Sequence, residues 1–265
     1  MTETILKAGY YQFKPEFGKP QRNLSQIIGA IKKATADLIV LPELPFTGYL
    51  FNDREELKSL AQAIDNSAIV ETLTDLCKDK NFHIVTGFAE RDKDRLFNSA
   101  LLIGPQGVLQ VYRKLHLFYN EKNIFDPGDR PFAVTQVGPA KVGMMICFDY
   151  MFPEAARSLA LQGADLIAHP SNLVLDYCQP AMLTRCLENN IFAITANRCG
   201  TDKRPQGELT FTGKSQIAGP KGTLIHHAPE SGAELFIAEI DLDLARDKMV
   251  TEYNHVLDDR RPEYY

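Results

Sequence analysis

One stretch of the chain occurs twice, and this repetition decides the expected fold. The stretch Ala36-Asp37-Leu38-Ile39-Val40-Leu41-Pro42 resembles Ala164-Asp165-Leu166-Ile167-Ala168-His169-Pro170. Each copy is a short apolar run that ends at a proline, a pattern typical of a buried strand. The turn Gly104-Pro105-Gln106-Gly107 likewise resembles Gly219-Pro220-Lys221-Gly222. We therefore predict two similar halves; the alternative is that such turns and strand starts recur by chance.

Strands and amphipathic helices surround the first copy. Apolar periodicity predicts strands over 4–12, 38–41, 82–88, 98–103 and 108–116. It also predicts three helices: one that opens at Asn23, one that runs from the Asp53 cap to about Ile64, and one over 69–77. Turn residues between the last two strands predict a hairpin.

The same order begins again after a loop at Pro127-Gly128. We predict a hairpin over 132–147, a helix over 153–162 closed by Gly163, and a strand over 166–169. This order favours an α/β protein in which two sheets pack face to face with helices outside. Strand ends from both halves would then face one crevice, the usual position of an active site in such folds.

Composition limits the class of protein. With 265 residues, 45% hydrophobic and 24% charged, the chain is long enough for a substantial core, and we treat 1–265 as a single domain. A net charge of −5 without a basic stripe argues against nucleic acid. The absence of a long apolar run argues against a membrane span, and the first four residues lack signal-peptide features, so we expect a cytoplasmic protein.

Neither a metal nor a cofactor is expected. Five cysteines without a C-x-x-C pair fit neither a disulfide framework nor a zinc site, and His226-His227 has no second cluster to join. Gly213-Lys214-Ser215 follows Gly207 at the wrong spacing for a phosphate-binding loop, and residues 209–218 read as a strand.

Cys147 is the candidate nucleophile. It ends the apolar run 142–146 and precedes Pro153, which opens a predicted helix. Near a helix N-terminus the backbone N–H groups favour a thiolate. The alternative is a buried thiol that packs as a small apolar side chain.

Glu43 and Lys114 are its candidate partners. Glu43 follows a buried strand between two prolines, where partial desolvation raises the pKa of a carboxylate toward that of a general base. Lys114 lies within the 108–116 strand on the face of Tyr112, and an inward lysine is costly unless paired or used. The alternatives are a glutamate that caps a strand or pairs with an arginine, and a lysine whose charged end reaches the surface, as we expect for Arg113.

These side chains form a working set for attack on a carbonyl or nitrile carbon. The carboxylate takes the thiol proton, the thiolate attacks, and the ammonium stabilises the charge that develops on oxygen or nitrogen. No histidine is required.

Three spaced motifs resemble those of the nitrilase superfamily of carbon–nitrogen hydrolases. They are Leu41-Pro42-Glu43, Arg113-Lys114-Leu115-His116-Leu117-Phe118 and Gly143-Met144-Met145-Ile146-Cys147-Phe148-Asp149. The resemblance extends to residues 152–157 and 169–172, and thus covers essentially the whole chain.

The resemblance implies a four-layer αββα sandwich and a triad of Glu43, Lys114 and Cys147. It further implies that Glu121 shapes the pocket and holds the substrate amide, although Glu121 could be a solvated loop residue. The backbone N–H of Phe148 would join Lys114 as an oxyanion hole. The family also implies a homodimer or higher oligomer whose interface the C-terminal tail, 251–265, crosses; the alternative is a disordered end.

Phe148-Asp149 after the nucleophile points to the amide branch of the superfamily. The expected reaction is cleavage of a small amide through a cysteine acyl-enzyme, with water as co-substrate and release of ammonia. The alternatives are a nitrilase for small aliphatic nitriles, an N-carbamoyl amidohydrolase, and a catalytically silent binding protein.

The candidate substrate-binding residues are mostly aromatic, which suits a small uncharged acyl group. They are Tyr49, Phe118, Tyr119, Phe148, Tyr150 and Asn172. The aromatic ones could equally pack in the core. A carbamoyl amino acid would need a basic anchor such as Arg185 or Arg198.

Overall fold

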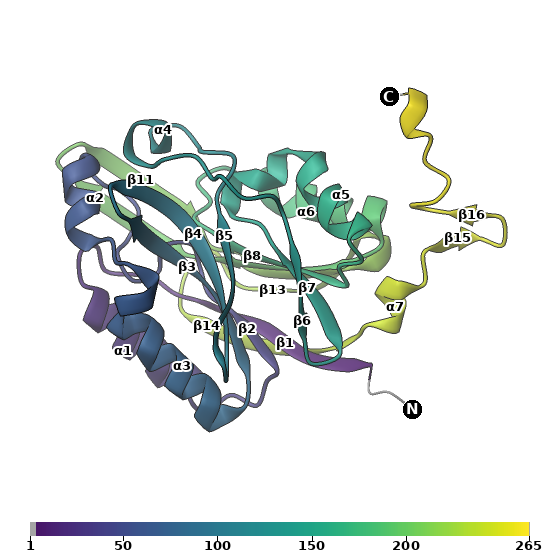
Figure 1. Cartoon of the computed structure of the whole chain (residues 1–265), viewed down its shortest axis with the longest axis horizontal. Helices are drawn as coiled ribbons and strands as arrows, with labels where there is room; N and C mark the ends of the chain where they lie inside the picture. The colour runs from purple at the N-terminus through teal and green to yellow at the C-terminus, as the bar shows by residue number, and fades with distance from the viewer. Residues whose placement is uncertain (1–3, 265) are drawn as a thin grey trace.

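Two six-stranded sheets pack face to face, and helices cover their outer faces (Figure 1). The computed structural model describes residues 4–264. Helices α1 (Pro20–Ile31) and α3 (Ala68–Lys80) cover one sheet, and α5 (Pro153–Leu161) and α6 (Cys178–Asn189) cover the other. The predicted four-layer αββα sandwich is confirmed.

The two sheets share one strand order. The first runs β14-β1-β2-β3-β4-β5 and the second β6-β7-β8-β9-β12-β13. In the first sheet β1, β2 and β3 are parallel, and β4 and β5 follow as antiparallel neighbours. In the second, β7, β8 and β9 are parallel, and β12 and β13 follow in the same way. The two predicted halves are therefore repeated in topology as well as in sequence.

The strand bounds are as follows. The first sheet holds β1 (Ile5–Gln12), β2 (Leu38–Val40), β3 (His83–Asp92), β4 (Arg95–Gly104), β5 (Gly107–Arg113) and β14 (Glu234–Asp241). The second holds β6 (Val134–Val137), β7 (Ala140–Met144), β8 (Leu166–Ser171), β9 (Phe192–Asn197), β12 (Gln216–Gly219) and β13 (Thr223–His227). Two small hairpins pair β10 (Cys199–Arg204) with β11 (Gly207–Thr212) and β15 (Met249–Thr251) with β16 (Asn254–His255).

Several predicted boundaries were wrong. β5 ends at Arg113, so Lys114 lies just beyond the strand and not within it. Residues 209–218 are not one strand, because β11 and β12 are separated by Gly213-Lys214-Ser215, where Gly213 and Lys214 adopt positive φ. β3 and β4 extend beyond the predicted apolar ranges, 82–88 and 98–103, and form a hairpin with a polar end.

The shorter helices lie around the strand ends. They are α2 (Arg54–Leu60), α4 (Glu121–Ile124), α7 (Asp243–Arg246) and 3₁₀ helices at Ile64–Asn66, Cys147–Met151, Pro220–Gly222 and Pro262–Tyr264. Asp53 caps α2 as predicted, but α2 ends at Leu60. Asn23 does not open α1, which begins at Pro20; its buried amide bridges the Glu16 backbone and the Phe46 carbonyl.

Two apolar layers hold the sandwich together. Between the sheets, buried side chains such as Leu6, Val40 and Ala168 share one core, which continues under α5 and α6. Outside the first sheet, a second core joins Ile27 of α1 and Leu73 of α3. Burial of this kind stabilises the fold by about 25 cal/mol per Å² of apolar surface.

The C-terminal segment extends away from the sandwich (Figure 1). Val250, Tyr253 and Tyr264 are 67%, 82% and 71% exposed, and Tyr265 lies outside the described residues. The predicted role of 251–265 in an oligomer interface stays a prediction. Within 4–264, no helix is long and apolar enough to cross a membrane.

Candidate active site

Glu43, Lys114 and Glu121 meet in a buried ionic group. Lys114 Nζ donates to Glu43 Oε1 at 2.7 Å and to Glu121 Oε1 at 2.8 Å. The side chains of Lys114 and Glu43 are fully buried, and that of Glu121 is 4% exposed. An ammonium between two carboxylates, shielded from water, is thus a fixed charge in the crevice where the strands end.

Glu43 lies three residues after the end of β2, and only one of its carboxylate oxygens is hydrogen-bonded. Asn98 Nδ2 donates to Oε1 at 2.6 Å, but Oε2 is buried and has no protein hydrogen-bond partner. Burial raises the pKa of Glu43 above the ordinary carboxylate range, and Lys114 opposes this effect only in part. An unpartnered, more basic carboxylate oxygen is what a general base requires.

The loop that carries Glu43 lies directly against Gly87 of β3. A Cβ at residue 87 would fall 2.5 Å from Glu43 Cα and 2.3 Å from the Leu44 nitrogen. Any side chain there would push the carboxylate away, so Gly87 is a positioning residue that the sequence did not reveal. Leu44 itself adopts φ +47°.

Lys114 is fixed by its backbone as well as by its charge partners. Its carbonyl accepts from Gly128 N at 2.9 Å, and a Cβ at residue 128 would fall 2.1 Å from the Arg113 carbonyl oxygen. Burial alone would lower the pKa of Lys114, but Glu121 and Glu43 outweigh it and raise the pKa. Lys114 therefore stays charged.

Arg113 is buried, and the expectation of a surface arginine was wrong. Its guanidinium contacts Glu90 at 2.5 Å, Asp92 at 2.8 Å and Asp129 at 3.1 Å, and it lies over the Phe97 ring. Three carboxylates compensate the burial of this charge. The cluster anchors the end of β5 directly before Lys114.

Glu121 opens the short helix α4 and is not a solvated loop residue. Its Oε1 accepts from Tyr49 OH at 2.7 Å as well as from Lys114, and its Oε2 accepts from Phe118 N at 2.9 Å. Every contact holds the carboxylate toward the ammonium. Tyr49 is thereby part of the same group.

Cys147 follows β7 and begins a 3₁₀ helix with φ +41°, a rare conformation for a residue with a side chain. Burial raises the pKa of its thiol well above the ordinary value; Glu43 raises it further, while Lys114 and the Asn172 backbone N–H lower it. The expectation that the helix start favours a resting thiolate was therefore wrong. The thiol rests protonated beside a carboxylate.

Two buried side chains hold the peptide groups on either side of Cys147. His169 Nε2–H donates to the Cys147 carbonyl at 2.9 Å, and Asp149 Oδ2 accepts from Ile146 N at 2.8 Å. Burial lowers the pKa of His169 to about 4, so its ring is neutral. These contacts sustain the strained φ of the cysteine.

Asp149 also joins the cysteine segment to the lysine segment. Its carboxylate accepts from Tyr112 OH at 2.7 Å and from His116 Nδ1–H at 2.7 Å, residues on either side of Lys114. Asp149 is fully buried. The spacing between Cys147 and Lys114 thus depends on one carboxylate that our sequence reasoning did not use for this purpose.

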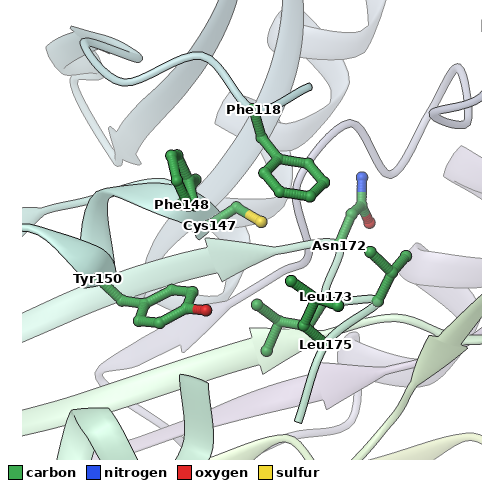
Figure 2. Close-up of a pocket in the computed structure, with 8 residues that line it drawn as sticks. Phe118, Cys147, Phe148, Tyr150, Asn172, Leu173 and Leu175 are labelled. Carbon is green, nitrogen blue, oxygen red and sulfur yellow. The ribbon is translucent and has the colours of Figure 1, made fainter. Parts of the chain in front are cut away.

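A small cavity lies over the sulfur of Cys147 (Figure 2). It has a volume of about 20 Å³, room for roughly one water molecule. Four candidate substrate-binding residues line it together with residues 173–175: Phe118, Phe148, Tyr150 and Asn172. The Asn172 side chain is buried, and neither its oxygen nor its nitrogen has a partner.

A larger cavity of about 440 Å³ adjoins the small one. Phe118 and Val174 line both, and Tyr49 and Glu121 line the larger. Tyr119 also lines it, with its side chain 84% exposed.

Neither predicted basic anchor lines either cavity. Arg198 is buried in a two-pronged contact with Asp202, at 2.6 and 2.8 Å. Arg185 donates to the Tyr150 carbonyl and to Glu188.

The chain combines a thiol beside a Glu–Lys–Glu group with an αββα sandwich. Its sequence is also similar to those of known proteins. The sequence profile of the carbon–nitrogen hydrolase family matches residues 7–248. A nitrilase of Pyrococcus abyssi (strain GE5 / Orsay) is 47% identical over 98% of this chain and 99% of that protein. An N-carbamoylputrescine amidase of Arabidopsis thaliana is 32% identical over 87% of this chain and 83% of that protein.

A solved structure of an amidase has the same fold. It is a variant of the amidase of Nesterenkonia sp. AN1, which shows covalent addition of the acetamide moiety of fluoroacetamide at the active site cysteine. It aligns with a TM-score of 0.79 and 25% identity, covering 98% of this chain and 95% of that chain. The chain belongs to the carbon–nitrogen hydrolase family, and the predicted resemblance to the nitrilase superfamily is confirmed. It is an enzyme of the amidase and nitrilase type.

Proposed function

We propose that the chain hydrolyses the carbon–nitrogen bond of small amides, with Cys147 as nucleophile and Glu43 as general base. The single observation that carries this proposal is the Lys114 ammonium, held between Glu43 and Glu121 where its charge also acts on the Cys147 thiol. A fixed cation and an unpartnered carboxylate oxygen beside a neutral thiol are the parts that acyl transfer needs.

Acylation begins with proton transfer from the thiol to Glu43. The sulfur attacks the amide carbon as the S–H bond breaks, and Lys114 and the Phe148 N–H stabilise the oxyanion that forms. Collapse of this tetrahedral intermediate breaks the C–N bond, and Glu43 returns the proton to the departing nitrogen. Ammonia leaves and a thioester remains on Cys147.

Deacylation uses the same residues with water as nucleophile. Glu43 takes a proton from water, the hydroxyl oxygen attacks the thioester carbon, and the carboxylic acid leaves as the proton returns to the sulfur. Glu121 and the Asn172 amide supply acceptors and a donor for the substrate amide before attack.

Nitriles are the second candidate substrate class, favoured by the 47% identical relative that is named a nitrilase. Attack on a nitrile gives a thioimidate on Cys147 in place of the tetrahedral oxyanion. N-Carbamoyl amino acids are disfavoured, because Arg185 and Arg198 are engaged elsewhere and line neither cavity.

The test is ammonia release across matched amides, nitriles and carbamoyl compounds of equal chain length. We expect the amides to give the highest kcat/KM, and Cys147→Ala to abolish release while the melting temperature is kept. Cys199→Ala, which alters another buried thiol, is the control and should keep full activity. Mass spectrometry of the intact protein should show an acyl adduct on the wild type and on Cys199→Ala, but not on Cys147→Ala. Activity that survives in Cys147→Ala would contradict the mechanism, and inactivity toward every compound would favour the silent binding protein.

A further inference from the structure

We infer that the larger cavity receives the acyl chain of the substrate and selects against chains that end in a carboxylate. This inference rests on the proposed function and deepens it by naming the substrate class. Uncharged chain ends fit the cavity, and so do positively charged ones.

The volumes of the two cavities indicate where the two parts of a substrate bind. The small cavity beside the sulfur, at about 20 Å³, accommodates little beyond the reacting group. A longer acyl chain has to pass Phe118 and Val174, which line both cavities, into the space of about 440 Å³. Glu121, which contacts Lys114, marks where the larger cavity meets the ionic group.

The lining carries negative charge without positive charge. Among the described residues that line the two cavities there is no lysine, arginine or histidine, whereas Glu121 and Glu208 contribute carboxylates. Lys114 is covered by its two glutamates and lines neither cavity.

Two arginines close in sequence to lining residues, Arg54 and Arg204, are already engaged. Arg54 donates to the Ile124 carbonyl and forms an ion pair with Asp126 at 2.5 Å. Arg204 is held by Glu56 and lies over the Phe17 ring.

At the rim the balance is the same. Glu208 lies on the β10–β11 hairpin with its side chain 53% exposed, and its partner Lys203, at 3.1 Å, is 75% exposed. That lysine reaches into solvent and does not line the cavity. Neutral polar groups, Asn120 and Gln206, complete this part of the wall.

A carboxylate at the end of the acyl chain would therefore lose part of its hydration and face the Glu121 and Glu208 carboxylates, whose lysine partners do not line the cavity. Taking an ionised group from water without a counter-charge is costly, and like charges add to that cost. A carboxamide of the same shape carries no charge, and an ammonium is attracted. The cavity thus separates substrates by charge at nearly constant size.

Succinamide and succinamate test this, since they differ only in one carboxamide against one carboxylate. We expect kcat/KM for ammonia release to be at least about tenfold higher for succinamide at pH 7, which corresponds to about 1.4 kcal/mol. 4-Aminobutanamide, with a cationic end, should be hydrolysed at a rate comparable to succinamide. Succinonitrile and 3-cyanopropanoate provide the same comparison for nitriles.

Glu208→Lys places a cation at the rim and should lower the succinamide-to-succinamate ratio by about threefold or more. Glu239→Lys, the matched control, changes the net charge equally at an exposed position of β14 away from both cavities. It should leave the ratio unchanged. Equal rates on succinamide and succinamate, a poor rate on 4-aminobutanamide, or an unaltered ratio in Glu208→Lys would each overturn the inference. Failure to release ammonia from any of these compounds would contradict the proposed function and the inference with it.

Discussion

The ends of β2 and β8 occupy equivalent places in the two sheets and carry different chemistry. β2 leads through Leu41 and Pro42 to Glu43, a buried carboxylate beside an ammonium. β8 ends in His169-Pro170-Ser171, where a neutral imidazole holds the Cys147 carbonyl. The repeated topology brings both ends to one crevice, but of the two strand ends only that of β2 carries a charged side chain.

This asymmetry indicates how the site divides its tasks. Glu43, Lys114 and Glu121 all come from the first half, whereas Cys147 and Asn172 come from the second. The charges are therefore fixed by one sheet, and the second sheet presents the thiol to them. Changes in the two halves should differ in kind, not only in size.

Equivalent substitutions at the two strand ends test this division most strongly. Glu43→Gln keeps the shape but removes the base, and we expect kcat to fall by about 10³-fold, within the range for loss of general-base catalysis. Ser171→Ala, at the equivalent place in β8, should lower kcat by less than about tenfold. Steady-state ammonia release measures both, and circular dichroism checks the folds. Similar losses in the two variants would show that the halves share the chemistry equally.

Asp149→Asn tests the connection between the halves. Asparagine has one acceptor oxygen where aspartate has two, and its NH2 group only donates. It cannot accept from Ile146, Tyr112 and His116 together, so the cysteine and lysine segments should shift apart. We expect kcat to fall by about 10²-fold with a smaller change in KM, since a shift of about 1 Å costs this much in rate.

The control for this substitution is Asp165→Asn, which alters a buried acid at the opposite end of β8. It should lower stability and leave kcat nearly unchanged. Slower alkylation of Cys147 in Asp149→Asn alone would support the positioning role, and parallel losses in both variants would argue against it.

The smallest effect concerns His169, whose equivalent in the first half is Leu41. The folded pKa is about 4 against 6.5 in the unfolded chain, so protonation favours unfolding. Stability is therefore lost as the pH falls from 6.5 through 4, by up to about 3 kcal/mol, using 1.36 kcal/mol for each pKa unit.

Denaturant titrations at pH 7 and pH 4 measure this loss. Between pH 7 and pH 4, the free energy of unfolding should fall by about 3 kcal/mol more in the wild type than in His169→Gln. An identical pH dependence in both proteins would mean that His169 does not hold its proton state through burial.

The sequence predicted the layers, and it placed the candidate residues Glu43 and Cys147 after strands, because both features leave local signals. Strands such as β2 and β8 are short apolar runs between turn residues, and Glu43 and Cys147 directly follow such runs. Strand alternation made Lys114 a candidate, and the family resemblance implied a role for Glu121. These predictions depended on neighbours along the chain.

What the sequence did not predict depends on partners far apart in the chain. The Asp149–Tyr112 contact joins residues 37 positions apart, and the Arg113 cluster collects Glu90 and Asp92 from β3 and Asp129 from a later loop. Helix α6 was missed because its buried positions include two cysteines and an asparagine in place of the usual apolar residues. In each case the environment of the side chain depends on the folded structure and not on the residue type alone.

The placement of the cysteines makes the protein suited to active-site titration. All five are free and buried, but only Cys147 lines either of the two cavities described above. Burial raises the pKa of all five thiols, but only Cys147 combines a cavity with a nearby carboxylate, Glu43, that can take its proton. The other four should therefore be inert toward electrophiles while the fold is intact. A small haloacetamide should then react at a single position, and the moles of label incorporated would count working molecules in any preparation.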